Sequence, residues 1–453
     1  MFIRPPRLAL VSAFSLTLVS GLLAQDPPQR PWRLREALGT PDWLKVSGSL
    51  RLRYEGLTGQ YRTASRLDYA DHLMVQRTLL RADAKFDTLG LTAEIQDSRH
   101  YGGGNGSMID TTVVNPLDVL QAYGEIDGKL GSGSQRLRLG RETIDVGSRR
   151  LVARNRFRNT INAFTGVDWE WESEHSSVRG FWTMPVMRRP TDLPSLVDNE
   201  LVFDRQSVDV QFGGASYEQE IDGHAVNAYF LVLLEDTGRH RQLYTPGARL
   251  LRKSKRGMID YELEAALQFG ESRTSATGAD LDHIAWFAHA SVGYTYNVAW
   301  TPRVQLAFDY ASGDQNPTDG DNNRFDTLFG ARRFEYGPTG IYGAIARSNI
   351  LSPEARVSVR PVKELRAILA WRALWLASDQ DAWTTSGLRD ASGNSDVYVG
   401  QQLESSLRWD VIDRSLTVEL GGVILFNGDF QRQAPGGQRG DTAYAYLQAA
   451  WTF

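Results

Sequence analysis

Several residue types and patterns are missing from this chain of 453 residues, and each absence narrows its class. There is no cysteine, which excludes disulfides, thiolate metal ligands and a cysteine nucleophile. After residue 24 no run of about twenty apolar residues occurs and the mean hydropathy is −0.36, so a bundle of membrane-spanning helices is excluded. A secreted soluble protein or a β-barrel remains, because only helices and closed barrels satisfy their backbone inside lipid.

The features needed for catalysis or nucleic-acid binding are also scarce. The seven histidines are scattered and there is no GxSxG motif, so a hydrolase is not supported. His283 and His289 share a predicted strand face but stand roughly 20 Å apart at strand rise, too far to act together. A net charge of −4 and a pI near 6.0 argue against a nucleic-acid partner. We therefore expect no enzymatic activity and no cofactor.

Alternating apolar and polar residues are the strongest local signal in the chain. In MIDYELEAALQFG the residues Ile259, Leu263 and Phe269 fall on one face of a strand, and Glu262 and Glu264 on the other. The same pattern recurs in RVQLAFDY and GVDWEWE, and the chain holds 42 Gly, 17 Tyr, 18 Phe and 12 Trp. A two-layer sandwich would also alternate, so this pattern alone leaves sandwich and barrel open.

The lengths of the connections favour the barrel. Short links lie at 87–89, 254–257, 361–364 and 411–415, and long polar links at 56–71, 147–162, 312–348, 378–397 and 427–441. Short and long links alternate between candidate strands of roughly ten residues. The chain therefore predicts an all-β, transmembrane antiparallel barrel of about 18 strands, with short periplasmic turns and long extracellular loops.

Both ends of the chain fit export to the bacterial outer membrane. Arg4 and Arg7 precede an apolar run that ends at Ala24 before QDPPQR, the pattern of a signal peptide cleaved after Ala24. No Lys or Arg follows at once as a stop signal, which disfavours a retained anchor. The terminal AYLQAAWTF, ending in Phe453, resembles the strand by which the barrel assembly machinery recognises its clients. We expect a signal peptide over residues 1–24, a periplasmic segment over residues 25–44, and the barrel over residues 45–453. Within the periplasmic segment we expect a short helix before the first strand.

Four segments match a known family in order along the chain. They are AEIQDSRHYG, GRETIDVGSRRLVARNRFRNTINAFTGV, YASGDQNPTDGDNNRFDTLFG and ILAWRALWLAS. These segments resemble the alginate export family of outer-membrane porins. The resemblance implies an eighteen-stranded barrel whose arginine-lined constriction lets an anionic uronate polysaccharide such as alginate leave the periplasm. The chain departs from the family pattern at two positions, with Asn162 in place of an arginine and Thr165 in place of an aspartate, and Asp168 follows directly after Val167. Other anionic solutes or oligosaccharides therefore remain alternatives to alginate as the substrate.

The stretch GSRRLVARNRFRNT, residues 147–160, carries five arginines and no acid in a chain of net charge −4. One interpretation is a solvated outer loop that contacts lipopolysaccharide phosphates. The other is a loop folded inward across the lumen, which the arginines on polar strand faces favour. Guanidinium stays charged and offers planar paired donors to carboxylates, so a row of arginines suits an anionic chain.

The residues expected along the lumen follow from this second interpretation. Any of Tyr123, Phe157 or Trp182 facing inward would stack on a sugar ring, although packing in the barrel wall is the alternative for each. Arg239 and Arg241, in a different outer loop, are expected outside the conducting path. The lumen and substrate-path residues predicted from the sequence are Arg51, Arg77, Arg81, Arg141, Glu142, Arg149, Arg150, Arg154, Arg158, Asp168, Arg356 and Arg360.

Several further expectations concern loops and partners. Loop 312–348 should face outside or plug the mouth, and its segment 312–323 lacks the EF-hand spacing, so we expect a surface turn and no metal. The partners expected are an anionic polysaccharide or small anionic solute, outer-membrane lipid and lipopolysaccharide, and the barrel assembly machinery. Periplasmic export partners are left open. The rival function is an uptake porin for small organic acids, oligosaccharides or hydrophobic compounds.

Overall fold

The alternating sequence forms nineteen strands in one sheet in the computed structural model, which describes residues 31–453. One of them, β14 (Asp321–Asn322), spans two residues and pairs in parallel with β12, and the other eighteen form an antiparallel barrel. The expected signal peptide lies outside the described residues. The eighteen strands are β1 (Leu44–Thr58), β2 (Ala70–Phe86), β3 (Leu89–Tyr101), β4 (Asn115–Leu130), β5 (Gly133–Glu142), β6 (Phe164–Glu172), β7 (Ser176–Pro185), β8 (Val210–Ile221), β9 (His224–Glu235), β10 (Gln242–Arg252), β11 (Ile259–Ser272), β12 (Leu281–Thr295), β13 (Arg303–Ala311), β15 (Ile350–Val362), β16 (Leu365–Trp375), β17 (Tyr398–Ile412), β18 (Leu416–Asn427) and β19 (Thr442–Thr452).

The last strand closes the sheet on the first. β1 and β19 pair from Ser49 with Thr452 to Thr58 with Ala443. Beyond this ladder, the Phe453 N–H donates to the Gly48 carbonyl at 2.9 Å and the Gly48 N–H donates back at 2.8 Å. Closure leaves no free sheet edge, as a wall facing lipid requires. The predicted barrel of eighteen strands is confirmed.

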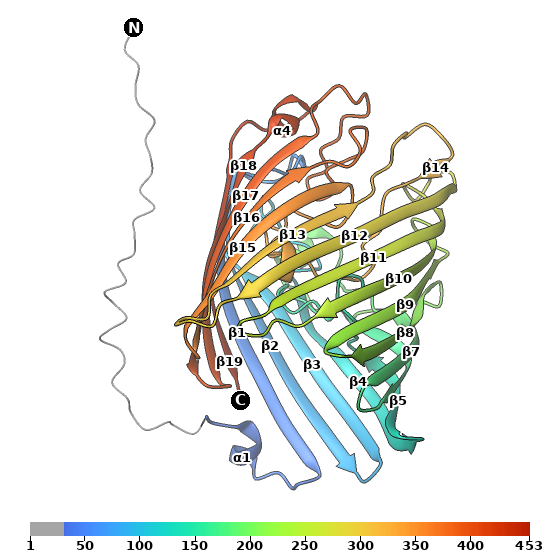
Figure 1. Ribbon diagram of the computed structural model, residues 1–453, viewed down its shortest axis with the longest axis vertical. Helices are drawn as coiled ribbons and strands as arrows, with labels where there is room; N and C mark the ends of the chain where they lie inside the picture. Colours follow the sequence, from blue (N-terminus) through green and yellow to red (C-terminus); the bar gives the residue numbers. More distant parts are fainter. Residues whose placement is uncertain (1–30) are drawn as a thin grey trace, which may run out of the picture.

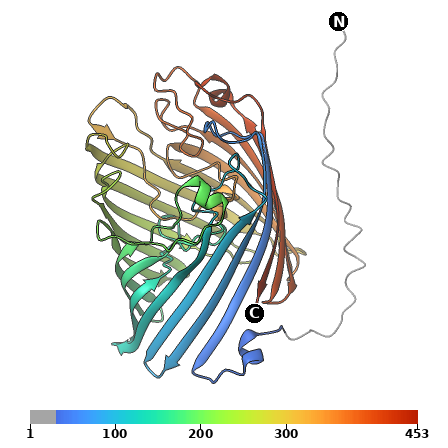
Figure 2. The same ribbon diagram turned by 180° about the vertical axis from the view of Figure 1, so that it is seen from behind.

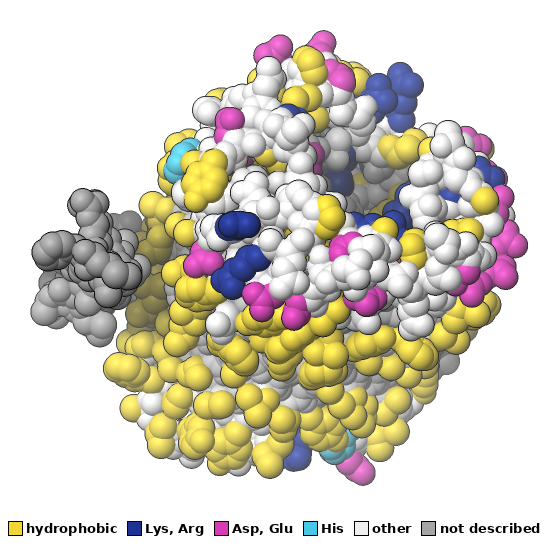
Figure 3. Space-filling model, turned by 90° about the horizontal axis from the view of Figure 1, so that it is seen from above, with side chains coloured by type: hydrophobic (Ala, Val, Ile, Leu, Met, Phe, Trp, Pro, Cys, Tyr) yellow, Lys and Arg dark blue, Asp and Glu magenta, His cyan; other side chains and the backbone are white. Residues whose placement is uncertain are grey.

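The two faces of each strand meet different surroundings. Leu263 and Leu267 on β11 are 48% and 44% exposed on the outside, whereas Glu264 and Gln268 of the same strand are buried inside. Hydrophobic side chains cover the side of the outer wall that is visible in Figure 3, and Lys and Arg side chains are visible within the hollow at the upper end. The alternation predicted for β11 is confirmed.

Helices are few and short. They are α1 (Leu34–Leu38), α2 (Leu193–Val197), α3 (Arg333–Tyr336) and α4 (Asp429–Gln433). Within residues 31–453, no helix is long and apolar enough to cross a membrane. α1 falls where a short helix was expected before the first strand, and Trp32 ahead of it packs on Trp451 and Phe453 with ring centroids 5.8 and 5.6 Å apart.

Turns and loops separate to opposite ends of the barrel. The four short links named above are turns at the end where α1 and the C-terminus lie, and the long links gather at the end of α4 and inside the barrel (Figures 1 and 2). Loop 312–348 lies partly inside: Asp319 is exposed, whereas Phe325, Ile341 and Tyr342 are fully buried. A buried apolar loop must pack against the interior of the wall, so this loop narrows the lumen.

Candidate functional site

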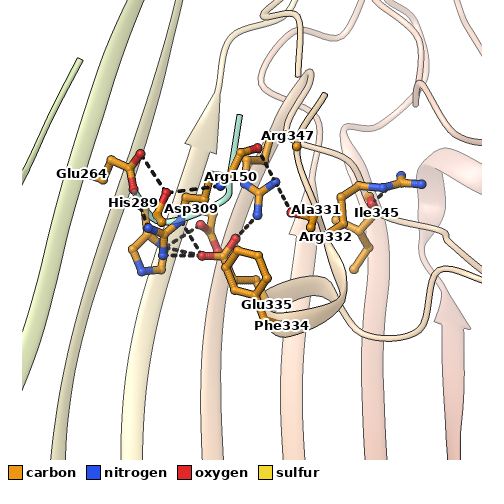
Figure 4. Close-up of polar contacts among 12 residues, drawn as sticks. Arg150, Glu264, His289, Asp309, Ala331, Arg332, Phe334, Glu335, Ile345 and Arg347 are labelled. Carbon is orange, nitrogen blue, oxygen red and sulfur yellow. Dashed lines mark hydrogen bonds and ion pairs between the residues drawn. The ribbon is translucent and has the colours of Figure 1, made fainter. Parts of the chain in front are cut away.

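The arginine-rich segment lies inside the barrel and is fixed to its wall. Arg150 is buried, and its guanidinium contacts Glu262 at 2.6 Å and Glu264 at 2.5 Å, both on β11. It also pairs with Glu335 on α3 (Figure 4). A buried cation is stable only with such partners, so Arg150 anchors the loop rather than facing the lumen.

Arginines of the opposite wall hold the other end of this loop by its backbone. Arg51 on β1 donates to the carbonyls of Arg156 and Phe157 at 3.0 Å each and of Arg158 at 2.8 Å. Arg77 on β2 donates to the carbonyls of Arg156 at 3.0 Å and Arg158 at 2.9 Å. Charged donors make stronger hydrogen bonds than neutral ones, so these contacts stretch the segment across the lumen from wall to wall.

A second inward segment runs beside the first. The Phe329 N–H donates to the Leu151 carbonyl at 2.9 Å, the Ala331 N–H to Arg149 at 2.9 Å, and the Ala153 N–H to Phe329 at 3.2 Å. A Cβ on Gly330 would overlap the Arg150 carbonyl oxygen, so only glycine fits at this crossing. We call these two paired segments, residues 149–158 and 329–336, the partition.

Glu335 joins the two segments of the partition electrostatically. It pairs with both Arg150 and Arg347, and Arg347 also donates to the carbonyls of Arg150 at 3.1 Å and Ala331 at 2.8 Å (Figure 4). Burial by itself would raise the pKa of Glu335, but the Arg150 and Arg347 guanidiniums hold that pKa well below its usual value. The carboxylate is therefore ionised at neutral pH and ties both loops together.

The His–Asp–Glu cluster beside the partition is an ion-pair network. His289, Asp309 and Glu335 offer nitrogen and oxygen atoms within 4.8 Å of one another, a spacing that a metal ion would accept. However, Asp309 already forms an ion pair with Arg372 at 2.8 Å, and Glu335 forms one with Arg150. A cation would have to displace these guanidiniums, so the cluster supports the loops instead.

The partition divides the lumen into two chambers. The outer chamber is a cavity of about 690 Å³ on the extracellular side, and the inner chamber is a cavity of about 470 Å³ on the periplasmic side. Neighbouring partition residues face opposite ways: Arg158 and Arg332 line the outer chamber, whereas Phe157 and Arg333 line the inner one. Any solute crossing the barrel through both chambers therefore meets arginines of the partition on each side.

The outer chamber is strongly electropositive. It is lined by six arginines and one carboxylate, Asp326; the arginines are Arg158, Arg188, Arg239, Arg241, Arg324 and Arg332. Among residues 31–453, no carboxylate pairs with Arg158, Arg188, Arg239 or Arg332. Burial, with the nearby charges of Arg332 and Arg188, lowers the pKa of Arg158 to about 9. Arg158 still carries its charge at neutral pH, and a bound anion would relieve the repulsion.

The inner chamber combines arginines with an aromatic ring. Phe157 lies under the guanidiniums of Arg53 at 4.3 Å and Arg333 at 5.0 Å, a cation–π arrangement. Arg333 is in turn neutralised by Glu404 at 2.6 Å and Glu419 at 3.4 Å. The arginines that line this chamber are Arg51, Arg77, Arg149, Arg156, Arg333, Arg356, Arg366 and Arg408.

The structure brings five of the predicted path residues to the chambers. They are Arg51, Arg77, Arg149 and Arg356 in the inner chamber and Arg158 in the outer one. Arg360 lies instead in a groove at the periplasmic rim. Phe157 lines the inner chamber, whereas Trp182 is 46% exposed on the outer wall, in the alternative position considered for it.

The other predicted path residues form ion pairs and line neither chamber. Arg138 contacts Asp168 at 2.7 Å and Glu142 at 3.6 Å, so these two acids belong to a ladder within the wall. Arg81 pairs with Asp83 at 2.7 Å, and Arg154 with Glu94 at 3.0 Å. Arg150 is the loop anchor described above.

Arg141 departs most clearly from its expected place. It lies on the same face of β5 as Leu139, which is 52% exposed on the outside of the barrel. Its guanidinium contacts Asp118 at 3.2 Å and donates to Gln206 at 2.8 Å. The lumen position predicted for Arg141 is therefore wrong, because residues two apart on a strand share a face.

Arg239 and Arg241, which were expected outside the conducting path, both line the outer chamber. Sequence reasoning did not single out Arg332 and Arg333, which stand in the long link 312–348. The apolar run GIYGAIA, residues 340–346 of the same link, would have indicated that this loop is buried.

Comparisons with known proteins agree with this architecture. A family model described as alginate export matches residues 42–445. Among solved structures, a BenF-like porin from Pseudomonas fluorescens is similar with a TM-score of 0.59 at 12% identity, over 91% of this chain and 99% of that one. Pseudomonas aeruginosa OpdK, solved with vanillate, gives 0.58 at 13% identity over 90% and 98% of the two chains. Pseudomonas aeruginosa OccK2 (OpdF), solved with glucuronate, gives 0.56 at 12% identity over 90% and 96%. No curated protein sequence matches the chain.

Proposed function

Because the chain belongs to the alginate export family of outer-membrane channels, we propose that its lumen passively conducts an anionic solute, with a uronate polysaccharide such as alginate leaving the periplasm as the favoured substrate. The observation that carries this proposal is the outer chamber, where four of six arginines have no carboxylate partner in the part of the chain that the structure describes. Unpaired guanidiniums in a confined space attract carboxylates, which a uronate chain carries on every sugar.

The chemistry of the path suits passage rather than tight binding. Contacts between exposed ions in a wet lumen contribute about 1 kcal/mol or less each, so a chain exchanges one arginine for the next without being trapped. Phe157, under Arg53 and Arg333, offers an apolar face to a sugar ring at the partition. A polymer must cross where Arg158 and Arg332 meet Phe157 and Arg333, so conduction requires the partition to shift.

Uptake of small organic acids is the second candidate function. Two structures with the same fold were solved with vanillate and glucuronate, which are small carboxylates. The two separate chambers, of about 690 and 470 Å³, have the size of small-molecule sites. In this alternative an acid would move from the outer chamber to the inner one, and no polymer would thread the lumen.

We also propose that the chain reaches the outer membrane after cleavage behind Ala24, with Gln25 as the first mature residue. The apolar run that ends at Ala24 carries this proposal. Mass spectrometry of the protein from isolated outer membranes tests it: a first peptide beginning at Gln25 is expected. A mature protein that retains the apolar run would overturn the cleavage.

Planar-bilayer recordings of the purified barrel test the main proposal. We expect a reversal potential that indicates anion preference, and current block by uronate oligomers but not by neutral oligosaccharides of equal length. Block that strengthens with oligomer length favours the polymer, because successive arginines engage successive carboxylates. Equal block by monomers and oligomers favours small acids. Cation preference without block would overturn both candidates.

A further inference from the structure

A third cavity, of about 650 Å³, lies at the periplasmic end of the barrel, away from the partition. Three turns enclose it: β10 to β11, β12 to β13, and β15 to β16. Its lining includes six cations and no carboxylate, and we call it the basic groove; the cations are Lys255, Arg256, Arg303, Arg360, Lys363 and Arg366.

Most of this positive charge is not neutralised by the protein. Arg303 pairs with Asp260, and Lys363, whose side chain is 89% exposed, contacts Glu364 at 3.2 Å. No ion pair joins Lys255, Arg256, Arg360 or Arg366 to an acid anywhere in residues 31–453. Like charges gathered in one cavity repel one another, so an anion is the partner that this arrangement lacks.

The groove has a defined backbone and an aromatic wall. The Arg360 N–H donates to the Trp300 carbonyl at 2.7 Å, which fixes the β12–β13 turn against β15. Trp300 and Thr301 have left-handed backbone φ angles of 66° and 40°, which residues other than glycine rarely adopt. The Trp300 side chain lines the groove and is 55% exposed. An indole beside cations suits a charged sugar, whose ring faces are apolar and whose edges are anionic.

The groove continues into the conducting lumen. Arg366, at the periplasmic end of β16, lines both the basic groove and the inner chamber. Arg356 and Arg408 continue the positive lining within that chamber. The cations that an anionic chain would meet beyond the groove therefore lie inside the barrel.

We propose that the basic groove is a loading site for an extended anionic carbohydrate on the periplasmic side, which rests on the proposed function and gives it a point of entry. A small acid would fill only part of it, whereas a chain of several uronates would reach from Lys255 and Arg360 to Arg366. The groove raises the local concentration of the chain and orients one end toward the inner chamber.

Charge reversal in the groove tests this proposal. The groove variant combines Lys255→Glu in the β10–β11 turn with Arg360→Glu near the periplasmic end of β15. Both residues are exposed, and neither has a carboxylate partner among the residues that the structure describes. The control variant combines Lys129→Glu near the periplasmic end of β4 with Arg414→Glu in the β17–β18 turn, and both cations are exposed. Uronate oligomers of about ten sugars are added to one side of channels inserted in a single orientation, and the on-rate of block is recorded.

We expect the groove variant to lower the on-rate from the periplasmic side by about tenfold at low salt, because electrostatic attraction acts mainly on association. Block of the groove variant from the extracellular side should match that of the wild type, and the control variant should be blocked like the wild type from both sides. An unchanged periplasmic on-rate in the groove variant would overturn the loading site while leaving the proposed function standing. A wild-type channel that shows neither anion selectivity nor block by uronate oligomers would instead overturn the proposed function.

A lipid or protein ligand is distinguished in the same recordings. Anionic phosphatidylglycerol in the bilayer tests for a lipid ligand. If this lipid lowers the periplasmic on-rate of block in the wild type but leaves the on-rate of the groove variant unchanged, the groove binds lipid headgroups and the proposal is overturned. Oligoglutamate blocking from the periplasmic side as well as uronate oligomers of equal charge would show that the site does not select carbohydrate. A clear preference for the uronate oligomer supports the proposal, since only the sugar stacks on Trp300.

Discussion

Arg332 and Arg333 are neighbours in sequence and lie on opposite sides of the partition. The Arg332 guanidinium lines the outer chamber and donates to the Ile345 carbonyl at 2.8 Å, without a carboxylate partner in residues 31–453. Arg333 lines the inner chamber between Glu404 and Glu419. One side of the partition therefore carries an unneutralised charge, and the other a charge held by acids.

Reversing the unpaired charges of the outer chamber should change selectivity. Arg158→Glu with Arg332→Glu is expected to move the reversal potential toward cations and to weaken block by uronate oligomers by at least about tenfold. Each charge contributes about 1 kcal/mol to the potential felt by a nearby ion in a wet lumen. Bilayer recordings at 0.1 M salt measure both effects.

A charge reversal on the outer surface provides the control for this variant. Arg432 on α4 is exposed and pairs only with Asp429 at 3.3 Å, so Arg432→Glu should leave the reversal potential unchanged. Equal behaviour of the wild type and the double variant would place the selectivity elsewhere, at Arg149, Arg356 or Arg366.

Salt should weaken the anion preference of the wild type. The Debye length falls from about 10 Å at 0.1 M to about 3 Å at 1 M, so the chamber arginines act over shorter distances at high salt. The permeability ratio of chloride to potassium is expected to approach the ratio of their free mobilities between these concentrations. A preference that is constant with salt would point to a steric filter rather than to the arginines.

Glu335→Gln should loosen the partition. The change removes the shared partner of Arg150 and Arg347, and an uncompensated buried charge costs about 3–5 kcal/mol. Fluctuating, larger single-channel currents are expected at pH 7. Asp429→Asn, which alters an exposed pair on α4, should leave the currents steady.

The pH dependence of the wild type follows from the same carboxylate. Its pKa in the folded protein lies below the ordinary value of 4.5, so its stabilising contribution is complete above about pH 4.5 and declines as the pH falls toward the folded pKa. Currents of the wild type should stay steady from pH 7 to 5 and fluctuate only in more acidic solution. Fluctuation that already begins near pH 6.5 would show that Glu335 does not control the partition.

Deleting residues 451–453 should prevent assembly. The deletion removes the rings of Trp451 and Phe453 that pack on Trp32, and the hydrogen bonds between Phe453 and Gly48 that extend the closing ladder. We expect loss of the heat-modifiable band on gels and degradation in the periplasm. Normal amounts of folded barrel in the outer membrane would show that the terminal strand is dispensable as a signal.

The barrel wall could be predicted from the sequence because its cause is local. Each strand faces lipid on one side and the barrel interior on the other. In β11, Leu263 and Leu267 therefore alternate with the polar residues Glu264 and Gln268. Links such as 361–364 and 312–348 then differ in length according to the end of the barrel at which they lie. These patterns need no knowledge of contacts between distant residues.

The interior could be predicted only in part because its contacts are between distant residues. Nothing near Arg150 in sequence indicates that it pairs with Glu264 and Glu335, so its role as an anchor was invisible. The same holds for Arg239, which lies in the exposed link between β9 and β10 and lines the outer chamber. Charge alone does not separate arginines that face a solute from those that hold a loop.

The hydrogen bonds from Arg51 and Arg77 to the carbonyls of residues 156–158 have an evolutionary consequence. Every amino acid supplies the same carbonyl, so mutations that replace the side chains of Arg156, Phe157 or Arg158 leave the attachment of the loop intact. The side chains that face a solute at this point can therefore be exchanged one at a time, while the hydrogen bonds that hold the loop across the lumen stay in place.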